Sequence, residues 1–266
     1  GGGKRSVLPM SGKTGVLTGA AGGIGRATAE RFAKDGWSLV LVDRTDAVKA
    51  VAAELVAATG ASIVGVAADV TNPGDYALID AEIARLGNPL KFLGLIAGVL
   101  QEVGSIETLE VEEWDRVFNI NTRANFLLIK HFIPALRAAQ GAAIVTISSW
   151  YGKSGHAYFG AYCASKAAVI SLTHTAAAEL AGDRIRVNSV APGNVATSMH
   201  FDALREEAAK RSISFEEMKK IEWDKIPLGR AADPSELASA VAFLAGPDGA
   251  YITGATIDVN GGCLFS

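Results

Sequence analysis

Cysteine, net charge and long apolar runs are all scarce in this sequence, and each shortage argues against a class of protein. The 266 residues include two cysteines, so a disulfide framework is excluded and a reducing compartment is expected. The formal net charge is −3 and the lysines and arginines are scattered, unlike the basic stripe of a nucleic-acid binder. No apolar run approaches the roughly 20 residues that span a bilayer. We therefore expect a cytoplasmic, globular protein without a nucleic-acid or membrane partner.

What is present is a regular alternation of short apolar runs and alanine-rich stretches. The alternation predicts an α/β fold, a doubly wound parallel sheet with helices on both faces. Most of the apolar runs are apolar throughout, as in parallel strands that are buried on both sides. The runs predict about seven strands, at 14–18, 37–43, 62–69, 92–98, 142–149, 185–192 and 255–261. The intervening stretches predict helices near 24–34, 46–58, 73–86, 111–139, 160–181 and 234–245.

Proline and the absence of linkers define the limits of these elements. Asn72-Pro73 and Asp233-Pro234 each predict a helix start, a cap followed by proline in the first turn. No low-complexity tract divides the chain, so 11–266 is expected to form a single domain. Residues 1–10, GGGKRSVLPM, are interpreted as a tag or a flexible amino terminus.

One segment, about 198–226, interrupts the alternation with charged helical sequence. It is either a solvated helical pair or a lid, and we favour the lid because the segment leaves the carboxyl end of a strand, where open sheets bind ligands. In FEEMKKIEW an apolar face is expected to close over the ligands; its members are Phe215, Met218, Ile221 and Trp223.

The first predicted strand runs into a glycine-rich turn, TGAAGGIGR, typical of a Rossmann-type nucleotide site. Gly19 permits the tight turn, Gly23 lets backbone approach a pyrophosphate, and Gly25 lets the helix pack on the strand. Backbone N–H groups at the helix start, around Ile24, would meet the phosphate charge.

Three charged residues at strand ends bear on the cofactor. Asp43 would accept hydrogen bonds from both hydroxyls of the adenosine ribose and repel a 2′-phosphate, so we expect NAD(H) to be preferred. Arg44 beside it would instead favour a 2′-phosphate, which keeps NADP(H) as the alternative. Asp69, before Val70, is placed either to reach the adenine amino group or to cap the next turn.

Tyr162 and Lys166 lie four residues apart among small side chains, in AYCASKAAV. That spacing puts both on one helix face, where the ammonium is expected to lower the pKa of the phenol. A phenol with its pKa lowered would serve as a general base that takes a hydroxyl proton while hydride leaves the same carbon.

The chain resembles the short-chain dehydrogenase/reductase family from about residue 11 onward. The resemblance is carried by TGAAGGIG, Asn121 after WDRVFNI, Ser149, Tyr162-x-x-x-Lys166 and Pro192-Gly193. It implies that Tyr162 is the acid/base, that Ser149 hydrogen-bonds the reacting oxygen and that Lys166 binds the nicotinamide ribose. It also implies that Asn121 holds a water in the proton path. Taken singly, Ser149 could merely finish its strand and Asn121 could be a hydrogen bonder inside a helix.

The resemblance implies further cofactor contacts and contains one departure. Val195 and Thr197 would meet the nicotinamide carboxamide and the nearby phosphate region, and Ala97-Gly98 would let the adenosine approach. The family usually has Asn-Asn before that Ala-Gly pair, and this chain has Leu95-Ile96. The side chain that would brace backbone groups there is therefore expected to be missing.

These residues predict an NAD(H)-dependent oxidoreductase that interconverts a secondary alcohol and a ketone. A small polar substrate such as a polyol or sugar is favoured by the long lid and by Asp43; a 3-oxoacyl-carrier-protein reductase is the alternative. A non-catalytic dinucleotide-binding sensor or scaffold is disfavoured because the tyrosine, lysine and serine are all present. No metal site is expected, and the resemblance implies a homotetramer with dihedral symmetry. Substrate-pocket candidates are Ser149, Tyr151, His156, Phe159 and Asn194, with His156 either bonding a substrate hydroxyl or lying exposed in its loop.

Overall fold

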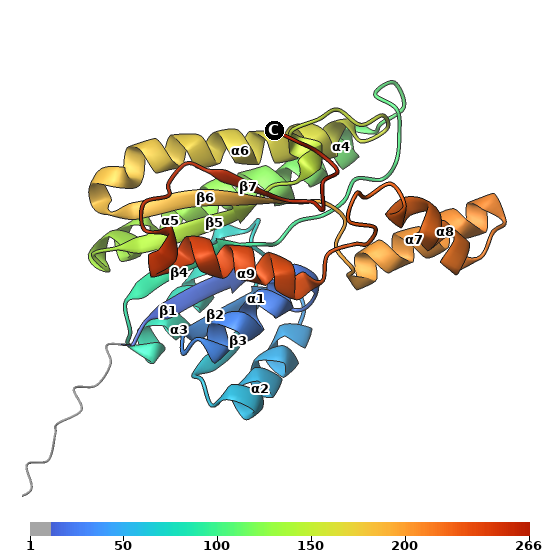
Figure 1. Ribbon diagram of the computed structural model, residues 1–266. Coiled ribbons are helices and arrows are strands. Elements are labelled where there is room, and N and C mark those ends of the chain that lie inside the picture. Colours follow the sequence, from blue (N-terminus) through green and yellow to red (C-terminus); the bar gives the residue numbers. More distant parts are fainter. Residues whose placement is uncertain (1–11) are drawn as a thin grey trace, which may run out of the picture.

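The central element is one parallel sheet of seven strands. The computed structural model describes residues 12–266, so the interpretation of residues 1–10 lies outside the described part. The spatial order is β3-β2-β1-β4-β5-β6-β7, and every neighbouring pair is parallel (Figure 1). The strands are β1 (Thr14–Thr18), β2 (Ser38–Asp43), β3 (Ile63–Ala67), β4 (Leu90–Leu95), β5 (Ala142–Ile147), β6 (Ile185–Pro192) and β7 (Thr256–Val259).

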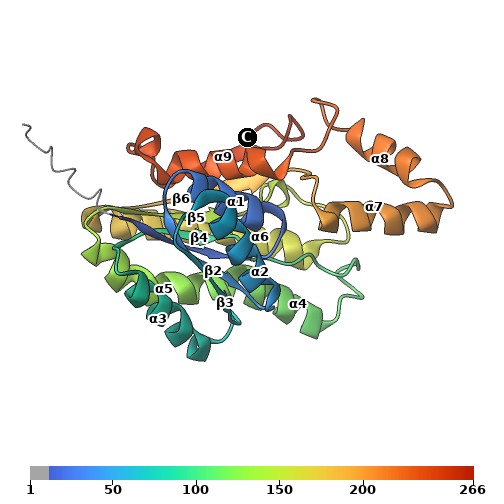
Figure 2. The ribbon, with the colours of Figure 1, turned by 90° about the horizontal axis from the view of Figure 1, so that it is seen from below.

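Helices cover both faces of the sheet, as predicted, and each face has its own apolar core (Figure 2). One face is covered by α1 (Gly23–Lys34), α2 (Ala47–Thr59) and α9 (Pro234–Ala245). The other is covered by α3 (Tyr76–Leu86), α5 (Ala124–Ala138) and α6 (Gly160–Leu180), with α4 (Val111–Phe118) beside α6. Since both cores are built from the apolar strands, the doubly wound α/β prediction is confirmed.

The strand order reverses at β1, which pairs with β2 on one side and β4 on the other. The chain segments that follow β1 and β4 therefore diverge above the carboxyl ends of these two strands. Open α/β sheets bind ligands in the crevice formed there. The same ends carry the glycine-rich turn after Thr18 and the short segment after Leu95.

Two predicted boundaries were wrong for identifiable reasons, and one predicted helix is irregular inside its predicted range. The fourth strand ends at Leu95 rather than at 98, because the Ile96 and Ala97 N–H groups donate to the Thr18 hydroxyl at 3.1 and 3.2 Å. Asn72 caps a 3-10 turn (Pro73–Asp75), and α3 begins only after it. The predicted helix over 111–139 is divided by η2, a π-helical segment over Asn119–Arg123. By contrast, α9 begins at Pro234 with an Asp233–Glu236 capping box, as predicted.

The charged excursion forms a helical hairpin, α7 (Ser198–Arg211) and α8 (Phe215–Trp223), that projects from the body of the molecule (Figure 1). Its two helices enclose a small core of their own: Leu204, Ala208 and Met218, with Phe201, Ile213 and Phe215 packed against them. Met218 is fully buried there. The expectation that Met218 faces the ligands is therefore wrong, because its side chain is used to join α7 to α8.

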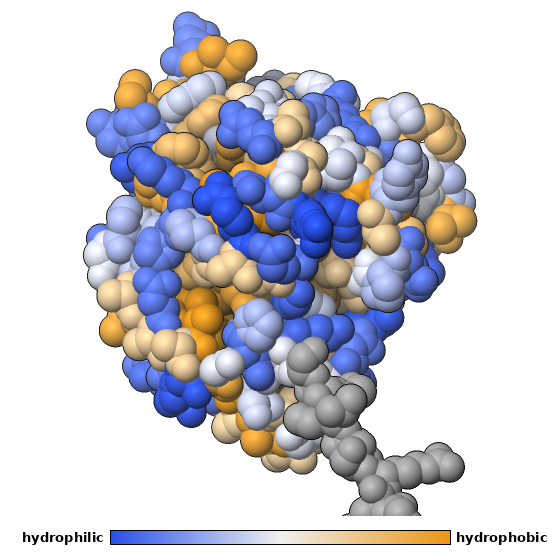
Figure 3. All heavy atoms as spheres, turned by 90° about the vertical axis from the view of Figure 1, so that its left-hand side faces the viewer, coloured by the Kyte–Doolittle hydropathy of each residue, from blue (hydrophilic) through white to orange (hydrophobic). Residues whose placement is uncertain are grey.

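The amino edge of the sheet carries the carboxyl ends of the covering helices and a group of cations. The Lys91 ammonium donates to the Ala139 carbonyl after α5, and the Arg186 guanidinium donates to the Leu244 and Gly246 carbonyls at the end of α9. Figure 3 shows hydrophilic residues gathered across this face. A cavity of about 760 Å³ lies here, with Lys13 and Arg184 also in its lining. Cations at helix carboxyl ends are favourable, so these residues stabilise the fold.

Candidate active site

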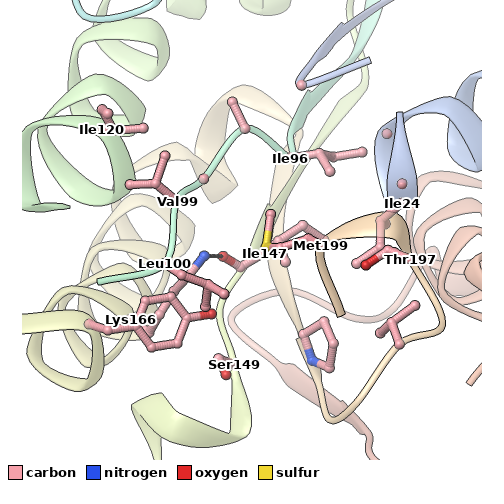
Figure 4. Close-up of a pocket in the computed structure, with 18 of the residues that line it drawn as sticks. Ile24, Ile96, Val99, Leu100, Ile120, Ile147, Ser149, Lys166, Thr197 and Met199 are labelled. Atoms are coloured by element: carbon pink, nitrogen blue, oxygen red, sulfur yellow. Dashed lines mark hydrogen bonds between the residues drawn. The ribbon is translucent and has the colours of Figure 1, made fainter. Parts of the chain in front are cut away.

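A cavity of about 910 Å³ opens at the carboxyl edge of the sheet and gathers nearly every predicted site residue. Each cofactor candidate lines it: Gly19, Gly23, Ile24, Gly25, Asp43, Arg44, Asp69, Val70, Ala97, Gly98, Tyr162, Lys166, Pro192, Gly193, Val195 and Thr197. Four substrate candidates line it as well: Ser149, Tyr151, Phe159 and Asn194. Asn121 and His156 lie outside this lining. Figure 4 shows Ile24 and Thr197 across the cavity from Lys166.

The glycine-rich turn leaves the start of α1 without a cap. Gly22 at the N-cap offers no side chain and the first turn contains no acidic residue, so its N–H groups keep their positive end free for an anion. A Cβ on Gly25 would lie 1.9 Å from the Gly19 carbonyl oxygen, and Gly23 has a φ of 57°. Open space lies beside Gly22. This cradle fits a pyrophosphate group of a dinucleotide.

Asp43 stands at the end of β2 beside that turn. One of its carboxylate oxygens accepts a hydrogen bond from the Ala21 N–H at 3.1 Å. The contact ties the end of β2 to the glycine-rich turn and fixes the carboxylate at the cavity wall. Arg44, the next residue, is exposed and lines the same cavity.

Asp69 makes the local turn that was one of its two expected roles. Its Oδ1 accepts from the Thr71 N–H at 2.9 Å and from the Thr71 hydroxyl at 2.7 Å, and the hydroxyl contact is the main reason that the pKa of Asp69 is lowered. Both contacts use Oδ1, so the turn and a ligand contact through Oδ2 are compatible.

The segment after β4 lacks the usual asparagines but is braced from another strand. Thr18 at the end of β1 accepts hydrogen bonds from the Ile96 and Ala97 N–H groups. The expected loss of bracing at Leu95-Ile96 is thus offset by the Thr18 hydroxyl. Beyond it, a Cβ on Gly98 would lie 3.3 Å from both the Lys166 Nζ and the Asn121 Oδ1, so a larger residue would crowd both groups.

Ser149, Tyr162 and Lys166 meet where β5 ends and α6 begins. Lys166 is only 5% exposed and its Nζ donates to the Ile147 carbonyl at 3.0 Å, the contact drawn in Figure 4. The ammonium lies 5.8 Å from the centre of the Tyr162 ring. Ser149 caps the short turn Trp150–Gly152, with its Oγ accepting from the Tyr151 N–H at 3.1 Å. The hydroxyl proton of Ser149 is not needed for that contact, so it can be donated into the cavity.

The pKa of the tyrosine departs from expectation. Burial raises the pKa of Tyr162 to about 12, and the Ser149 hydroxyl only partly opposes this shift. Burial also lowers the pKa of Lys166 to about 8. The pKa of the phenol is therefore raised, not lowered as expected, in the protein without ligands, because the loss of solvation is the largest influence on it and only the Ser149 hydroxyl acts in the opposite direction.

Asn121 lies in the π-helical segment and is almost completely buried. Its Oδ1 accepts from the Val99 N–H at 2.8 Å, while its Nδ2 donates to the Val99 carbonyl at 3.0 Å and the Ser165 hydroxyl at 3.1 Å. The side chain thus joins three segments around the cavity, in agreement with the alternative role of Asn121 as a hydrogen bonder inside a helix. Its side-chain donors are fully used by these contacts.

The end of the cavity beside Tyr162 is aromatic. The Tyr151 ring stacks on the His156 ring at 3.6 Å between centres and lies 5.4 Å from Phe159 and 5.9 Å from Tyr162. His156 is half-buried, and its Nε2 is 2.8 Å from the Ser154 hydroxyl. The alternative of an exposed loop histidine is therefore wrong, since His156 supports the back of Tyr151.

The segment after β6 is held on both sides. Val195 forms a bridge with Ala232, and the Gly193 N–H donates to the Val259 carbonyl at 2.9 Å. Thr197 caps α7, its Oγ1 accepting from the His200 N–H at 3.3 Å. Loop residues on the cavity wall are thereby fixed in place by the sheet and by α7.

Several cavity residues were missed by the sequence analysis. Met199, His200 and Ala203 reach the cavity from α7, and Arg116 reaches it from α4. The His200 Nε2 accepts a hydrogen bond from the Trp223 indole at 3.1 Å, which links α8 to the cavity wall. Gln101 was also missed, although it bonds the backbone of Tyr162. The amphipathic pattern of 198–226 was the one signal available, and it did not show which residues of that segment face the cavity.

Within residues 12–266, histidine, cysteine, aspartate and glutamate form no group of three or more suited to a metal ion. No helix in that range has both the length and the apolar character needed to cross a membrane.

Comparison with known proteins places the chain in a family. A family model described as enoyl-(acyl carrier protein) reductase matches residues 19–263. Galactitol 2-dehydrogenase (L-tagatose-forming) of Cereibacter sphaeroides is 37% identical, with 97% of this chain and 97% of that protein covered. Sorbitol dehydrogenase of the same organism is 34% identical, over 97% of this chain and 100% of that protein. The structure of L-sorbose reductase from Gluconobacter frateurii with NADPH and L-sorbose has a TM-score of 0.91 and 30% identity, covering 97% of this chain and 98% of that one.

The chain belongs to the short-chain dehydrogenase/reductase family. It is an NAD(P)-dependent oxidoreductase that acts on CH–OH groups and interconverts secondary alcohols and ketones. The alternative of a non-catalytic sensor or scaffold is set aside.

Proposed function

We propose that the enzyme acts on a small polar substrate, a polyol or sugar, at a secondary carbon, with NAD(H) as the preferred cofactor. The observation that carries the proposal is the meeting of Ser149, Tyr162 and Lys166 in the same cavity that receives the uncapped start of α1. A dinucleotide cradle and a buried acid/base pair in one cavity are what hydride transfer to or from an alcohol carbon requires.

The cofactor would be held along the carboxyl edge of the sheet. The start of α1 would hold the pyrophosphate, Asp43 the adenosine ribose, and Lys166 the nicotinamide ribose. Val70, Ala97 and Gly98 would line the adenosine side, and Pro192, Gly193, Val195 and Thr197 the nicotinamide side. When bound, the dinucleotide supplies hydride transfer and, in its oxidised form, a positive charge at the nicotinamide ring.

In this proposal the proton moves through Tyr162. The Tyr162 Oη takes the hydroxyl proton in oxidation and returns it to the carbonyl oxygen in reduction, while the Ser149 hydroxyl donates to that oxygen. Because the phenol has a pKa of about 12 without ligands, it is poised as the acid of the reduction. As a base it needs additional positive charge nearby. Asn121 would hold a water in the proton path, and its side chain also keeps the segment at Val99 and α6 in register.

Substrate selection would fall to the aromatic end and the hairpin. Tyr151, Phe159 and Asn194 border the reacting position, and His156 orients Tyr151 from behind. We propose that 198–226 is a lid, supported by the contribution of His200 and Met199 to the cavity wall. The names of the two dehydrogenases and of the sorbose reductase support a polyhydroxylated substrate.

The preference for NAD(H) rests on Asp43. Its carboxylate at the tip of β2 would repel a 2′-phosphate, while exposed Arg44 would favour one. The sorbose reductase structure was obtained with NADPH, so NADP(H) remains the competing cofactor.

A 3-oxoacyl-carrier-protein reductase is the second candidate. The description of the matching family model names an acyl-carrier-protein substrate, which favours this second candidate. The two candidates differ in the required substrate, since a thioester carries a long acyl arm and a polyol does not.

We further propose a cytoplasmic homotetramer with dihedral symmetry. Supporting it are exposed apolar residues on α4 and α5, Val111, Trp114 and Phe126, and the partly exposed edge strand β7. Tyr251, which precedes β7, is fully exposed.

The decisive experiment is an NAD-linked activity screen over polyols, sugars, hydroxysteroids, acetoin and 3-oxoacyl thioesters. We expect turnover of at least one polyol or sugar, and Tyr162→Phe to lower it by at least roughly 100-fold while NADH still binds. Turnover restricted to the thioesters would favour the second candidate. Substantial activity in Tyr162→Phe would contradict the assignment of the acid/base.

A further inference from the structure

Gln101 is a buried polar residue next to the proposed acid/base, and the reaction scheme above does not use it. Its side chain is 4% exposed, and both ends of its amide have partners. The Oε1 accepts from the Tyr162 N–H at 3.0 Å, and the Nε2 donates to the Tyr158 carbonyl at 3.1 Å. Both partners are backbone groups, and an N–H can only donate while a carbonyl can only accept. The orientation of the amide is therefore determined by its surroundings.

The first contact serves as a helix cap supplied from another segment. Helix α6 begins at Gly160, and Phe159 at its N-cap has no side-chain acceptor. The first backbone bond into the helix comes from the Cys163 N–H, which donates to the Phe159 carbonyl at 2.9 Å. The N–H of Tyr162 precedes it and has no partner in the helix. Gln101 provides that partner, at the residue whose side chain must be held at the reacting carbon.

The second contact fixes the approach to the helix. Tyr158 has a φ of 70°, which is unusual for an aromatic residue and needs support from its surroundings. Its carbonyl accepts from the Gln101 Nε2 and also from the Gly104 N–H at 3.2 Å. The turn into α6 is therefore bonded to the segment around Gln101 at two points.

That segment is itself firmly held. Val99 is bonded at both its N–H and carbonyl by Asn121. The Leu100 carbonyl accepts from Arg116 at 2.9 Å, and the Glu102 N–H donates to Glu113 at 2.7 Å. Gln101 thus projects from a segment fixed on each side to α4 and η2.

We infer that Gln101 is a positioning residue for Tyr162: its amide joins the segment after β4 to the start of α6 and sets where the phenol stands. The inference rests on the proposed role of Tyr162 as the acid/base. Displacing a reacting group by about 1 Å can cost roughly 100-fold in rate, so the effect should fall on kcat rather than on substrate or cofactor binding.

The test compares three variants with the wild-type enzyme on whichever alcohol the activity screen identifies. Gln101→Leu removes both contacts, whereas Gln101→Glu keeps an acceptor for the Tyr162 N–H and loses the donor to the Tyr158 carbonyl. Gln140→Leu, at an exposed glutamine, is the matched control. We expect Gln101→Leu to lower kcat roughly 10- to 100-fold with KM and NADH affinity within about twofold. Gln101→Glu should also lower kcat, because a carboxylate oxygen would face the Tyr158 carbonyl oxygen, and Gln140→Leu should match the wild type.

Thermal unfolding and NADH binding establish that each variant is folded. If Gln101→Leu does not fold, Gln101→Asn replaces it, since its amide is one methylene too short to reach both backbone groups. Unchanged kcat in Gln101→Leu, or in Gln101→Asn where that variant replaces it, would overturn the inference. Loss expressed only in KM would also overturn it. A wild-type enzyme inactive on every alcohol would refute the proposed function instead, so the two failures are distinguishable.

Discussion

At the scale of single residues, the site combines groups whose surroundings work against their charged forms. Lys166 is enclosed, and its ammonium donates to the Ile147 carbonyl. Burial lowers its pKa to about 8 and raises that of Tyr162 to about 12. The fold encloses both groups in a cavity near the end of β5. This enclosure lowers the stability of the folded state at pH values where Lys166 is charged, but it leaves a site ready to accept a ligand.

This makes a prediction about stability and pH. The folded protein holds Lys166 with a pKa of about 8, whereas an unfolded lysine has about 10.5, so between these values the unfolded state binds more protons. The contribution of Lys166 to stability therefore rises with pH through this window. The difference in unfolding free energy between wild type and Lys166→Met should increase by about 2 kcal/mol from pH 8 to pH 10. Chemical denaturation at both pH values measures it.

Lys130→Met, at an exposed lysine of α5, serves as the control. The difference in unfolding free energy between wild type and this variant should be the same at both pH values. A constant difference between wild type and Lys166→Met over the same range would show that the buried lysine is better solvated than its contacts indicate.

A second prediction concerns the cofactor. Wild-type kcat/KM should be higher with NAD than with NADP, because Asp43 at the tip of β2 repels a 2′-phosphate. Asp43→Ser should narrow or reverse the gap. Steady-state kinetics with both cofactors decides this, with Asp46→Ser as a control at the exposed start of α2. A wild-type preference for NADP would mean that Arg44 dominates.

The residues that sequence could identify are those whose role depends on their own segment. The glycines at a strand-to-helix turn and the Tyr162–Lys166 pair on one helix face follow from local geometry. The pKa of Tyr162 could not be predicted, because it depends on how deeply the site is enclosed by other segments. Gln101 and His200 were missed for the same reason: their partners are 61 and 23 positions away along the chain.

At the scale of elements, the apolar runs were sufficient to predict the strands, while helix boundaries depended on contacts elsewhere. The strand predicted over 92–98 stops early because Thr18 takes its N–H groups. The division of 111–139 by a π-helical segment follows no composition signal, since Asn121 is fixed there by bonds to Val99 and Ser165. In 198–226 the spacing of apolar residues predicted an apolar helix face, but it did not predict that this face packs against the other helix of the hairpin.

The hairpin of α7 and α8 gives a third prediction. It should show low amide-exchange protection across 200–225 without ligands, rising when NAD and a substrate analogue bind. Trp223→Phe removes the indole donor to His200 while keeping a ring. We expect it to raise the KM for substrate several-fold and to leave NAD affinity unchanged.

Met218→Ala separates this role from the stability of the hairpin. It opens a cavity between α7 and α8 and should lower protection throughout the hairpin even with ligands present. Ile221→Ala, at an exposed position of α8, is the neutral control. Protection that is already high without ligands and does not change would identify the hairpin as a fixed wall.

At the scale of the whole molecule, the two edges of the sheet have opposite electrostatic character. The uncapped start of α1 faces the large cavity, while Lys91 and Arg186 neutralise helix ends at the other edge. Parallel strands with covering helices impose this polarity, since the helices that cover the sheet run back from its carboxyl edge to its amino edge.

The fourth prediction concerns assembly. Exposed apolar residues on α4 and α5, together with edge strand β7, should be covered in solution by other copies of the chain. One chain has a mass of 27.6 kDa, and light scattering at micromolar concentration should give four times that mass. Trp114→Glu, at an exposed position of α4, should shift the mass towards smaller species, and a monomeric wild type would contradict the proposal.

The small separate core of the α7–α8 hairpin has a consequence for how such an enzyme can diverge. Leu204, Ala208 and Met218 pack within the hairpin, so substitutions there can shift Met199, His200 and Ala203 at the cavity wall without touching the packing on either side of the sheet. The segment departs after Thr197 and returns at Ile226, which is buried again in the body of the protein. Selection can therefore lengthen, shorten or replace this module while the tyrosine, lysine and dinucleotide cradle stay as they are, so that new substrates are acquired without first losing turnover.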